Sequence, residues 1–370
     1  MRTTPIIQFG TSRFLQAHAD LFVSQAMEQG QDAGPITVVQ SSGDAGRAKR
    51  LAALVGSYPV RIEGLADGRR IRETVSVGSI TRTLSTACDW PEVSRVFVEE
   101  AKIVVSNTGD TGFTARDCDT APGFEQGMSY PAKLMHLLRL RFAAGAAPIQ
   151  IMPMELIVDN GAVLKRRVLE LAQDTPAGFR AYLERDVVWV NSLVDRIVSQ
   201  PLEPAGAVAE PYALWAIEDQ PGLLLPCTHP AVVVVEALAE IEALKLFVLN
   251  LGHTVLAERW REAQGGDDVL VRHLVGLPEE RASLKHVLDA EVRPAFVAAG
   301  LGDRFDDYVE TTFERFANPF LDHRIADIAQ NHPQKVTRRI AAMLDWARAR
   351  GDLSDKPILS AIVARSGAAS

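Results

Sequence analysis

A strand, a glycine turn, a helix and a second strand follow one another at the start of the chain. Residues 6–9 and 36–40 are short β-branched runs, and residues 12–30 between them repeat apolar side chains at helical spacing. Gly10 follows the first run, and Gly30 supplies a stop signal for the helix. Parallel strands need a crossover connection of this kind, so the segment predicts a βαβ unit that begins a parallel sheet.

The same alternation continues well beyond this first unit. Further strand-like runs occupy residues 103–106, 149–154, 187–198 and 232–235, although the last could equally be a buried helix. Helical spacing with Gly and Pro punctuation then takes over in residues 241–264, 282–299, 305–317 and 335–350. We therefore expect an α/β protein with a Rossmann-like, doubly wound parallel sheet over residues 1–235 and an all-helical domain over residues 236–370.

Composition limits the class of ligand. The 370-residue chain carries a net charge of −8, whereas nucleic-acid binders concentrate Lys and Arg on one face, so we expect a small-molecule ligand and no nucleic acid. Cys88, Cys118 and Cys227 lack the spacing of a disulfide framework or a zinc site and are expected to be reduced. The first apolar run leaves no room for a signal peptide, and no stretch has the length of a membrane helix, so a soluble, cytoplasmic protein is expected.

The turn after the first strand is where a dinucleotide pyrophosphate binds in such folds. Of the G-x-G-x-x-G pattern only Gly10 is present, because Ser12 and Leu15 occupy the other two positions. A purely structural turn is the alternative, as is an Asx turn at Asn107. Candidates for cofactor contact at the turn and at the strand ends are Gly10, Ser12, Phe14, Ser41, Asn107 and Thr108.

The identity of the nucleotide stays open at this point. The second strand ends in Gln40-Ser41-Ser42, with no acidic residue to accept the ribose hydroxyl as in typical NAD sites. Arg47 and Lys49 follow and are available to a 2′-phosphate, although charges of this kind commonly form a solvated helix face. NAD is expected, and NADP is not excluded.

Three polar side chains interrupt an apolar helix in the second half of the chain. At about 100° per residue, Lys245, His253 and Asn250 lie at about 0°, 80° and 140°, on one arc. A Lys among Leu and Phe neighbours loses solvation, which favours its neutral, basic form. Oxidation of an alcohol needs such a base and donors that hold the reacting oxygen. A snorkelling Lys and a satisfied core His are the structural alternatives.

These residues carry a resemblance. Lys245-x4-Asn250-x2-His253 resembles the catalytic signature of the polyol-specific long-chain dehydrogenases, the mannitol dehydrogenase family. The resemblance extends along the chain to segments 7–14, 193–197 and 315–319. Segments 129–134, 155–161 and 193–198 are most similar to the tagaturonate reductase and mannonate oxidoreductase branch.

The resemblance implies a mechanism without metal. Lys245 would be the general base in oxidation and the general acid in reduction, Asn250 would hydrogen-bond the reacting oxygen, and His253 would orient the substrate. Glu242 matches an acid that exchanges the proton with solvent. Residues that match motifs lining the family's substrate cleft are Glu155, Asp195, Arg315 and Asn318.

Two departures limit what the resemblance implies. Glu155-Leu156 stands where mannitol-specific members have Asp-Asn, so an amide that would hold the oxyanion is missing there. Ser12 replaces a glycine, and its side chain would crowd a closely approaching pyrophosphate.

The charged residues of these motifs also have a structural alternative. Asp195-Arg196 and Arg315 could each belong to an interdomain ion pair.

The expected function is an NAD(P)-dependent oxidoreductase that interconverts a secondary alcohol and a ketone on a sugar acid of the tagaturonate/altronate or fructuronate/mannonate type. A polyol/ketose dehydrogenase is the alternative within this class, and a non-catalytic dinucleotide sensor is the alternative outside it. A metal-dependent lyase or isomerase would need clustered ligands, and the eight histidines show no such spacing. Neither a metal nor a membrane partner is expected.

Overall fold

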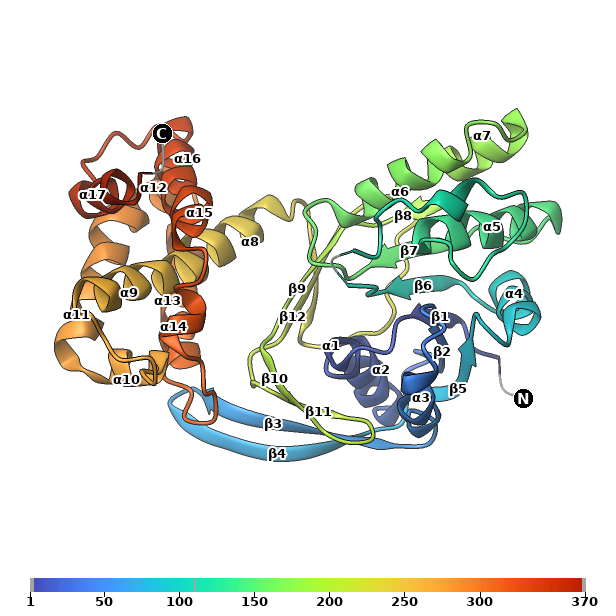
Figure 1. The fold of residues 1–370 in the computed structure, drawn as a ribbon, viewed down its shortest axis with the longest axis horizontal. Helices are drawn as coiled ribbons and strands as arrows, with labels where there is room; N and C mark the ends of the chain where they lie inside the picture. The colour runs from blue at the N-terminus through green and yellow to red at the C-terminus, as the bar shows by residue number, and fades with distance from the viewer. Residues whose placement is uncertain (1–2, 110, 368–370) are drawn as a thin grey trace. The chain divides into compact units, whose positions relative to one another are not determined.

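A computed structural model describes residues 3–109 and 111–367, and the chain divides into two compact units (Figure 1). The first, the sheet unit, holds the chain up to Ile62 together with Arg72–Leu238. The second, the helical unit, holds Glu63–Ile71 and the chain from Ala239 onward. Glu63–Ile71 therefore groups with helices that follow it by well over a hundred residues.

Six parallel strands form the central sheet of the sheet unit, in the order β5-β2-β1-β6-β7-β8. The strands are β1 (Ile6–Phe9), β2 (Ile36–Gln40), β5 (Ile80–Ser85), β6 (Ile103–Ser106), β7 (Gln150–Pro153) and β8 (Val188–Trp189). Counted along the chain, this is the 3-2-1-4-5-6 order of a dinucleotide-binding fold, whose ligand cleft lies at the strands' carboxyl ends where the order reverses. The Rossmann-like sheet expected from the sequence is confirmed.

Helices cover the sheet because its strands are apolar on both faces. The helices are α1 (Arg13–Gln16), α2 (Ala19–Glu28), α3 (Ala48–Ala53), α4 (Trp90–Glu99), α5 (Tyr130–Ala143), α6 (Asn160–Leu171) and α7 (Ala177–Arg185). Apolar side chains of α4 to α7 share one buried core with Ile7, Phe9 and Val104 of the strands. The single helix expected over residues 12–30 is in fact two, because the helix breaks between Gln16 and Ala19.

Two smaller sheets complete the strand pairing. One has the order β10-β11-β3-β4 and the other β13-β12-β9. Their strands are β3 (Tyr58–Ala66), β4 (Arg69–Val77), β9 (Ser192–Asp195), β10 (Val198–Pro201), β11 (Ala207–Ala209), β12 (Leu214–Glu218) and β13 (Val232–Val235). The ambiguous run at residues 232–235 is thus a strand. Its partner is β12, with which it pairs in parallel.

The helical unit contains ten α-helices among its described residues. They are α8 (Ala239–Leu244), α9 (Leu251–Glu262), α10 (Val271–Gly276), α11 (Pro278–Val287), α12 (Arg293–Ala298), α13 (Gly302–Phe316), α14 (Ile325–Ile328), α15 (His332–Val336), α16 (Ala342–Ala349) and α17 (Pro357–Ser366). Three helical runs are interrupted by π-helical turns, at Lys245–Asn250, Leu288–Val292 and Thr337–Ala341. π turns of this kind are rare and often mark functional sites. No helix in the described ranges has the length and apolar character needed to cross a bilayer.

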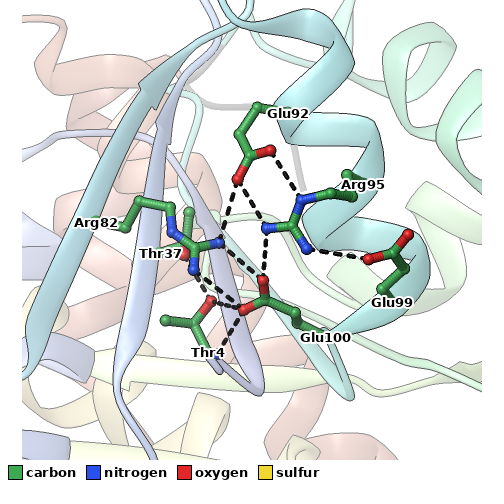
Figure 2. A network of polar contacts seen from close by, with 7 residues as sticks. All are labelled: Thr4, Thr37, Arg82, Glu92, Arg95, Glu99 and Glu100. Atoms are coloured by element: carbon green, nitrogen blue, oxygen red, sulfur yellow. Dashed lines mark hydrogen bonds and ion pairs between the residues drawn. The ribbon is translucent and has the colours of Figure 1, made fainter. Parts of the chain in front are cut away.

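A network of charges ties α4 to the sheet at the amino ends of its strands (Figure 2). Glu100 accepts hydrogen bonds from the backbone N–H of Thr4, at 2.8 Å, and from the guanidinium groups of Arg82 and Arg95, at 3.1 and 2.7 Å. Its side chain is only 7% exposed. The network lies at the edge of the sheet opposite to the carboxyl ends, so it serves the fold and leaves the ligand edge to other residues.

Candidate functional site

A cleft of about 340 Å³ opens at the carboxyl ends of β1, β2 and β6. Five of the six expected cofactor residues line it: Gly10, Ser12, Ser41, Asn107 and Thr108. Phe14 is not among its lining residues. The Phe14 ring instead packs against His18, with ring centroids 4.0 Å apart.

Gly10 is required by the close approach of two strand ends. Its φ is +124°, which L side chains rarely adopt, and a Cβ at this position would lie 2.4 Å from the carbonyl oxygen of Asn107. The turn after β1 is therefore packed directly against the end of β6. This packing forms the floor of the cleft.

The Ser12 side chain lines the cleft and is hydrogen-bonded on both sides of its hydroxyl. Its hydroxyl accepts a hydrogen bond from the N–H of Leu15, at 3.2 Å, and so caps α1. The same hydroxyl donates to the side-chain oxygen of Asn107, at 3.1 Å. The side-chain amide of Asn107 in turn donates to the carbonyl oxygen of Met154, at 3.0 Å. Ser12 thus links the turn after β1 to the ends of β6 and β7.

Glu155 lies beneath the turn at Thr108. One carboxylate oxygen accepts from the N–H and the hydroxyl of Thr108, both at 3.0 Å, and the other accepts from the hydroxyl of Ser106 at 3.0 Å. Burial raises the pKa of Glu155, and the hydrogen bonds from Thr108 and Ser106 oppose that shift. Within the sheet unit, this carboxyl group holds the cofactor-side turn in place.

Positive charge dominates the cleft lining. Five cationic residues line it: Arg13, Arg47, Arg50, Arg116 and Lys133. The Lys133 ammonium donates to the carbonyl oxygen of Ser41 at 2.6 Å, and burial, with a smaller effect of Arg116, lowers its pKa to about 8. Sequence reasoning considered only Arg47 of these five. The others lie on α1, α3, α5 and a loop, so no local spacing connects them.

In the helical unit, the three expected catalytic side chains lie on one continuous helical run. Lys245 begins the π turn, Asn250 ends it, and His253 follows on α9. In a π turn the hydrogen bonds run from residue i to residue i+5, so a residue lies nearly above the one five positions earlier. Lys245 and Asn250 are spaced by five, and the π turn brings them closer to one face than the 140° expected for a regular α-helix.

The π turn is fixed at its end by a neighbouring helical run. The carbonyl oxygen of Asn250 accepts hydrogen bonds from the hydroxyl of Thr254, at 2.9 Å, and from the guanidinium of Arg339, at 3.3 Å. Arg339 also donates to the Thr254 hydroxyl at 3.1 Å. Arg339 lies in the π turn Thr337–Ala341, 89 residues from Asn250, which is why no sequence motif pointed to it.

His253 is buried among rings and positive charges. Its ring centroid lies 4.3 Å from that of Phe316 and 5.0 Å from that of His323. Burial lowers the pKa of His253 well below its usual value, and His323, Arg339 and Arg315 lower it further. The imidazole is therefore neutral at physiological pH and has one donor and one acceptor nitrogen.

The remaining candidates occupy distinct places. Arg315 is 5% exposed on α13 and donates to the Tyr308 hydroxyl at 3.4 Å. The side-chain amide of Asn318 donates to the carbonyl oxygen of Glu63, at 3.3 Å, and accepts from the N–H of Phe320 at 2.9 Å. Asn318 thus fastens the segment Glu63–Ile71 to the helical unit.

Asp195 and Arg196 belong to the sheet unit. Asp195 is 5% exposed at the end of β9. Arg196 donates to the carbonyl oxygens of Glu210 and Ala17, both at 2.8 Å. These two acceptors lie in the sheet unit, so the hydrogen bonds of Arg196 bind parts of that unit together. Both of these bonds go to backbone carbonyl oxygens.

The described part of the chain contains neither a cluster of metal ligands nor a disulfide bond. No group of three or more His, Cys, Asp or Glu side chains in residues 3–109 and 111–367 is placed to hold a metal ion. The three cysteines are free thiols.

Comparison with known proteins covers almost the whole chain. The mannitol dehydrogenase Rossmann domain matches residues 4–223, and the mannitol dehydrogenase C-terminal domain matches residues 237–365. An altronate oxidoreductase of Bacillus subtilis (strain 168) is 28% identical over 381 residues, which cover 96% of this chain and 78% of that protein.

Two solved structures share the fold. A D-sorbitol dehydrogenase in substrate-free form matches with a TM-score of 0.81 at 19% identity, over 99% of this chain and 80% of that one. The mannitol 2-dehydrogenase of Pseudomonas fluorescens, in a ternary complex with NAD and D-mannitol, matches with a TM-score of 0.74 at 20% identity, over 98% and 78%. Together with the two domain matches, which leave only short segments uncovered, these findings place the chain in the mannitol dehydrogenase family, whose members are dehydrogenases that act on CH–OH groups.

Proposed function

We propose that the protein is an NAD-dependent oxidoreductase that interconverts a secondary alcohol and a ketone on a sugar acid, of the tagaturonate/altronate or fructuronate/mannonate type. The observation that carries the sugar-acid assignment is the positive charge around His253, where Arg315 and Arg339 both act on a buried imidazole. Such surroundings favour a substrate that carries a carboxylate. The altronate oxidoreductase relative points to the same substrate class.

The residues of the sheet unit fit a dinucleotide. The glycine turn, the strand-end side chains Asn107 and Thr108, and the cationic lining are the donors that a pyrophosphate and two riboses require. NAD is also the cofactor in the solved complex of the mannitol 2-dehydrogenase. The nicotinamide ring, when bound, supplies the hydride acceptor or donor. We assign residues 1–235 to cofactor binding and residues 236–370 to substrate binding and catalysis.

Lys245 is the acid/base of the proposed reaction. In oxidation its neutral amine takes the proton of the reacting hydroxyl, and in reduction its ammonium returns a proton to the oxygen of the former ketone. Glu242 lies on α8, three residues before Lys245, and exchanges the proton with solvent. No metal is needed, because the amine itself supplies the base.

Asn250 and the neutral His253 hold the reacting oxygen and the neighbouring hydroxyl of the substrate. An amide N–H and an imidazole N–H fixed before the reaction stabilise developing negative charge at little reorganisation cost. Arg315 binds the substrate carboxylate, for which a guanidinium offers two parallel N–H donors. Asp195, Glu155 and Asn318 are assigned to substrate binding. Within their own units, Glu155 also holds the Thr108 turn and Asn318 also holds the segment Glu63–Ile71.

A small-molecule substrate is the proposed partner, with neither nucleic acid nor membrane involved, and the cytoplasm is the proposed location. A polyol/ketose pair such as mannitol and fructose is the second candidate, favoured by the solved complex with D-mannitol. A dinucleotide sensor would keep the cleft without needing Lys245, Asn250 and His253 together. The presence of all three favours an enzyme.

The substrate class is tested by following reduced-nicotinamide absorbance with tagaturonate, fructuronate and fructose, with and without a chelator. Keto-uronates should be reduced with a kcat/KM at least about tenfold above that of fructose, and the chelator should leave the rate unchanged. Activity with fructose alone would move the protein to the polyol group. Turnover with none of the three, alongside nucleotide binding, would favour the sensor.

The role of Arg315 is tested by Arg315→Lys, which keeps the charge and removes the planar pair of donors. The KM for the keto-uronate should rise about tenfold or more, while the KM for fructose changes little, because fructose lacks a carboxylate. Equal effects on both substrates would mean that Arg315 serves the pocket and does not bind the carboxylate.

A further inference from the structure

We propose that the cleft at the end of β2 also binds the 2′-phosphate of an adenosine ribose, so that the protein accepts NADP(H) as well as NAD(H). The inference rests on the proposed dinucleotide-dependent function and adds a third phosphate to the groups that the cleft recognises. It concerns the cofactor end of the molecule and is independent of the substrate.

The charge of the cleft exceeds what NAD alone would balance. Its lining has five cationic side chains and no carboxylate among the described residues, whereas the pyrophosphate of NAD carries two negative charges. Arg13 and Arg47 have carboxylate partners, in Glu203 at 2.8 Å and Asp44 at 3.1 Å. Both of those carboxylates are at least half exposed, so solvent weakens their hold.

Arg50 is the least balanced of these cations. Its Nε atom is buried and has no hydrogen-bond partner. Burial lowers the pKa of Arg50, and the nearby charges of Arg13 and Arg47 lower it further, while Glu203 and Asp44 oppose the shift. Three guanidinium groups that disfavour one another are stabilised by an anion bound between them. Arg50 lines the cleft, so its guanidinium is placed to take part in binding such an anion.

These charges lie near the end of β2, where the adenosine ribose binds in such folds, as well as near the pyrophosphate position. In NAD-binding sheets an acidic residue at the end of the second strand accepts the ribose hydroxyls, and Gln40, Ser41 and Ser42 occupy that place here. The Lys133 ammonium donates to the carbonyl oxygen of Ser41 at 2.6 Å, and an ammonium has three N–H donors. Two donors therefore remain for a phosphate at the position where NAD-specific proteins place a carboxylate.

Side chains carry most of this anion recognition. In many dinucleotide folds a long helix after the first strand directs its dipole at the phosphates. Here α1 is a single turn, Arg13–Gln16, and its first N–H groups are partly used by the Ser12 cap. Guanidinium and ammonium groups, which bind a phosphate monoester well, therefore add to the donors of the glycine turn and the strand ends.

Equilibrium binding of two nucleotide fragments separates a 2′-phosphate site from a pyrophosphate site. Isothermal titration with adenosine 2′,5′-bisphosphate and with 5′-AMP compares ligands that differ only in the 2′-phosphate. The bisphosphate should bind at least about tenfold more tightly, and the difference should shrink with added salt. Equal affinities would overturn the inference and leave the cations to the pyrophosphate.

Two variants locate the site. Arg47→Ala removes a half-exposed guanidinium, and Lys133→Met removes the ammonium beside Ser41 while keeping the length of the side chain. Each should weaken bisphosphate binding about tenfold and 5′-AMP binding less than about threefold. Arg185→Ala, an exposed arginine at the end of α7 that does not line the cleft, is the matched control and should change neither. Loss of both ligands to the same extent would contradict a 2′-phosphate contact.

The outcome also separates this inference from the proposed function. Turnover of a keto-uronate with NADH, combined with equal binding of the two fragments, would overturn the inference alone. Preferential binding of the bisphosphate without turnover of any sugar would support the inference and contradict the proposed function. Failure of both fragments and of both dinucleotides to bind would overturn the two together.

Discussion

Asp20 is a fully buried carboxyl group on α2, with one oxygen accepting a hydrogen bond from the Tyr58 hydroxyl at 2.8 Å. Burial raises the pKa of Asp20 to about 7, against the opposing hydrogen bonds of Tyr58 and Gln8. The pKa in the folded state lies above that in the unfolded state, so folding favours the protonated form. The resulting stability is complete below about pH 4 and is lost as the pH rises through about 7.

Asp20→Asn should remove this pH dependence. The amide keeps an acceptor for Tyr58 but never ionises, so the variant should exceed the wild type in free energy of unfolding at pH 8 by up to ~4 kcal/mol. The difference should disappear at about pH 4. Urea titrations at both pH values measure it. A difference independent of pH would mean that the pKa of Asp20 is the same in the folded and unfolded states, and would contradict the effect of burial.

The catalytic candidates were accessible to sequence reasoning because Lys245, Asn250 and His253 lie within nine residues of one another. Their supporting residues were not. Arg339 contacts Asn250, which is 89 residues away in the sequence, and Lys133 contacts Ser41, which is 92 residues away. A pattern within one segment cannot predict contacts between residues so far apart. Sequence patterns thus find groups on one element and miss groups that several elements bring together.

At the scale of elements, the position of the π turn Lys245–Asn250 depends on a hydrogen bond from Arg339 in the π turn Thr337–Ala341. Arg339→Met removes the donor to the carbonyl of Asn250 and to the Thr254 hydroxyl while keeping the apolar stem. The turn should shift and kcat should fall by about tenfold or more, with the affinity for NADH unchanged, because misplacing a reacting group lowers the rate steeply. Steady-state kinetics and fluorescence titration of NADH measure the two quantities.

Arg338→Met is the matched control for this change. Arg338 is exposed, neighbours Arg339 in the same π turn and is not part of the contacts of Asn250. Its replacement should leave kcat within about twofold of the wild type. Equal losses in both variants would attribute the effect to the surface charge of the turn and not to the bond with Asn250.

The charge network of α4 should support stability in a manner that depends on pH (Figure 2). Burial opposes ionisation of Glu100, but its hydrogen bonds with Arg82, Thr4 and Arg95 outweigh burial and lower its pKa to about 2. With the folded pKa below the unfolded one, this stability is present above about pH 4.5 and is lost as the pH falls toward 2. Glu100→Gln should lower the free energy of unfolding by about 2 kcal/mol at pH 7 and by much less at pH 3.

Glu99→Gln provides the comparison within the same network. The Glu99 side chain is 60% exposed and accepts a hydrogen bond from Arg95 at 3.0 Å. Its replacement should change the free energy of unfolding by less than about 0.5 kcal/mol at either pH. Similar losses in the two variants would contradict the role given to the buried carboxylate.

Periodicity predicted five of the six parallel strands of the central sheet and the three longest helical runs, but it missed β5 and the irregularities of the helices. A π turn inserts one residue into an α-helix without changing its composition, so the segments 241–264, 282–299 and 335–350 each read as regular helices. The hairpin β3–β4 also escaped prediction. Its second strand alternates charged and small side chains and is mostly exposed, which gives little apolar signal.

At the scale of the whole molecule, the residues proposed for cofactor binding and those proposed for acid/base chemistry belong to different units. The strand ends of the sheet unit present Gly10, Asn107 and Thr108, and the helical unit presents Lys245, Asn250 and His253. Under the proposed function, a change in one set should therefore alter one property of the enzyme and spare the other. Nucleotide binding and turnover can be measured separately for this reason.

The proposed mechanism is tested most directly by the variant Lys245→Ala. Two quantities are measured for it: kcat for keto-uronate reduction and the dissociation constant of NADH. The kcat should fall by about a thousandfold, while the dissociation constant stays within about twofold, because the lysine acts on the reacting oxygen and not on the nucleotide. Lys285→Ala, an exposed lysine of the helical unit, should behave as the wild type. Turnover by Lys245→Ala at a rate comparable with the wild type would contradict the assignment of Lys245 as the acid/base.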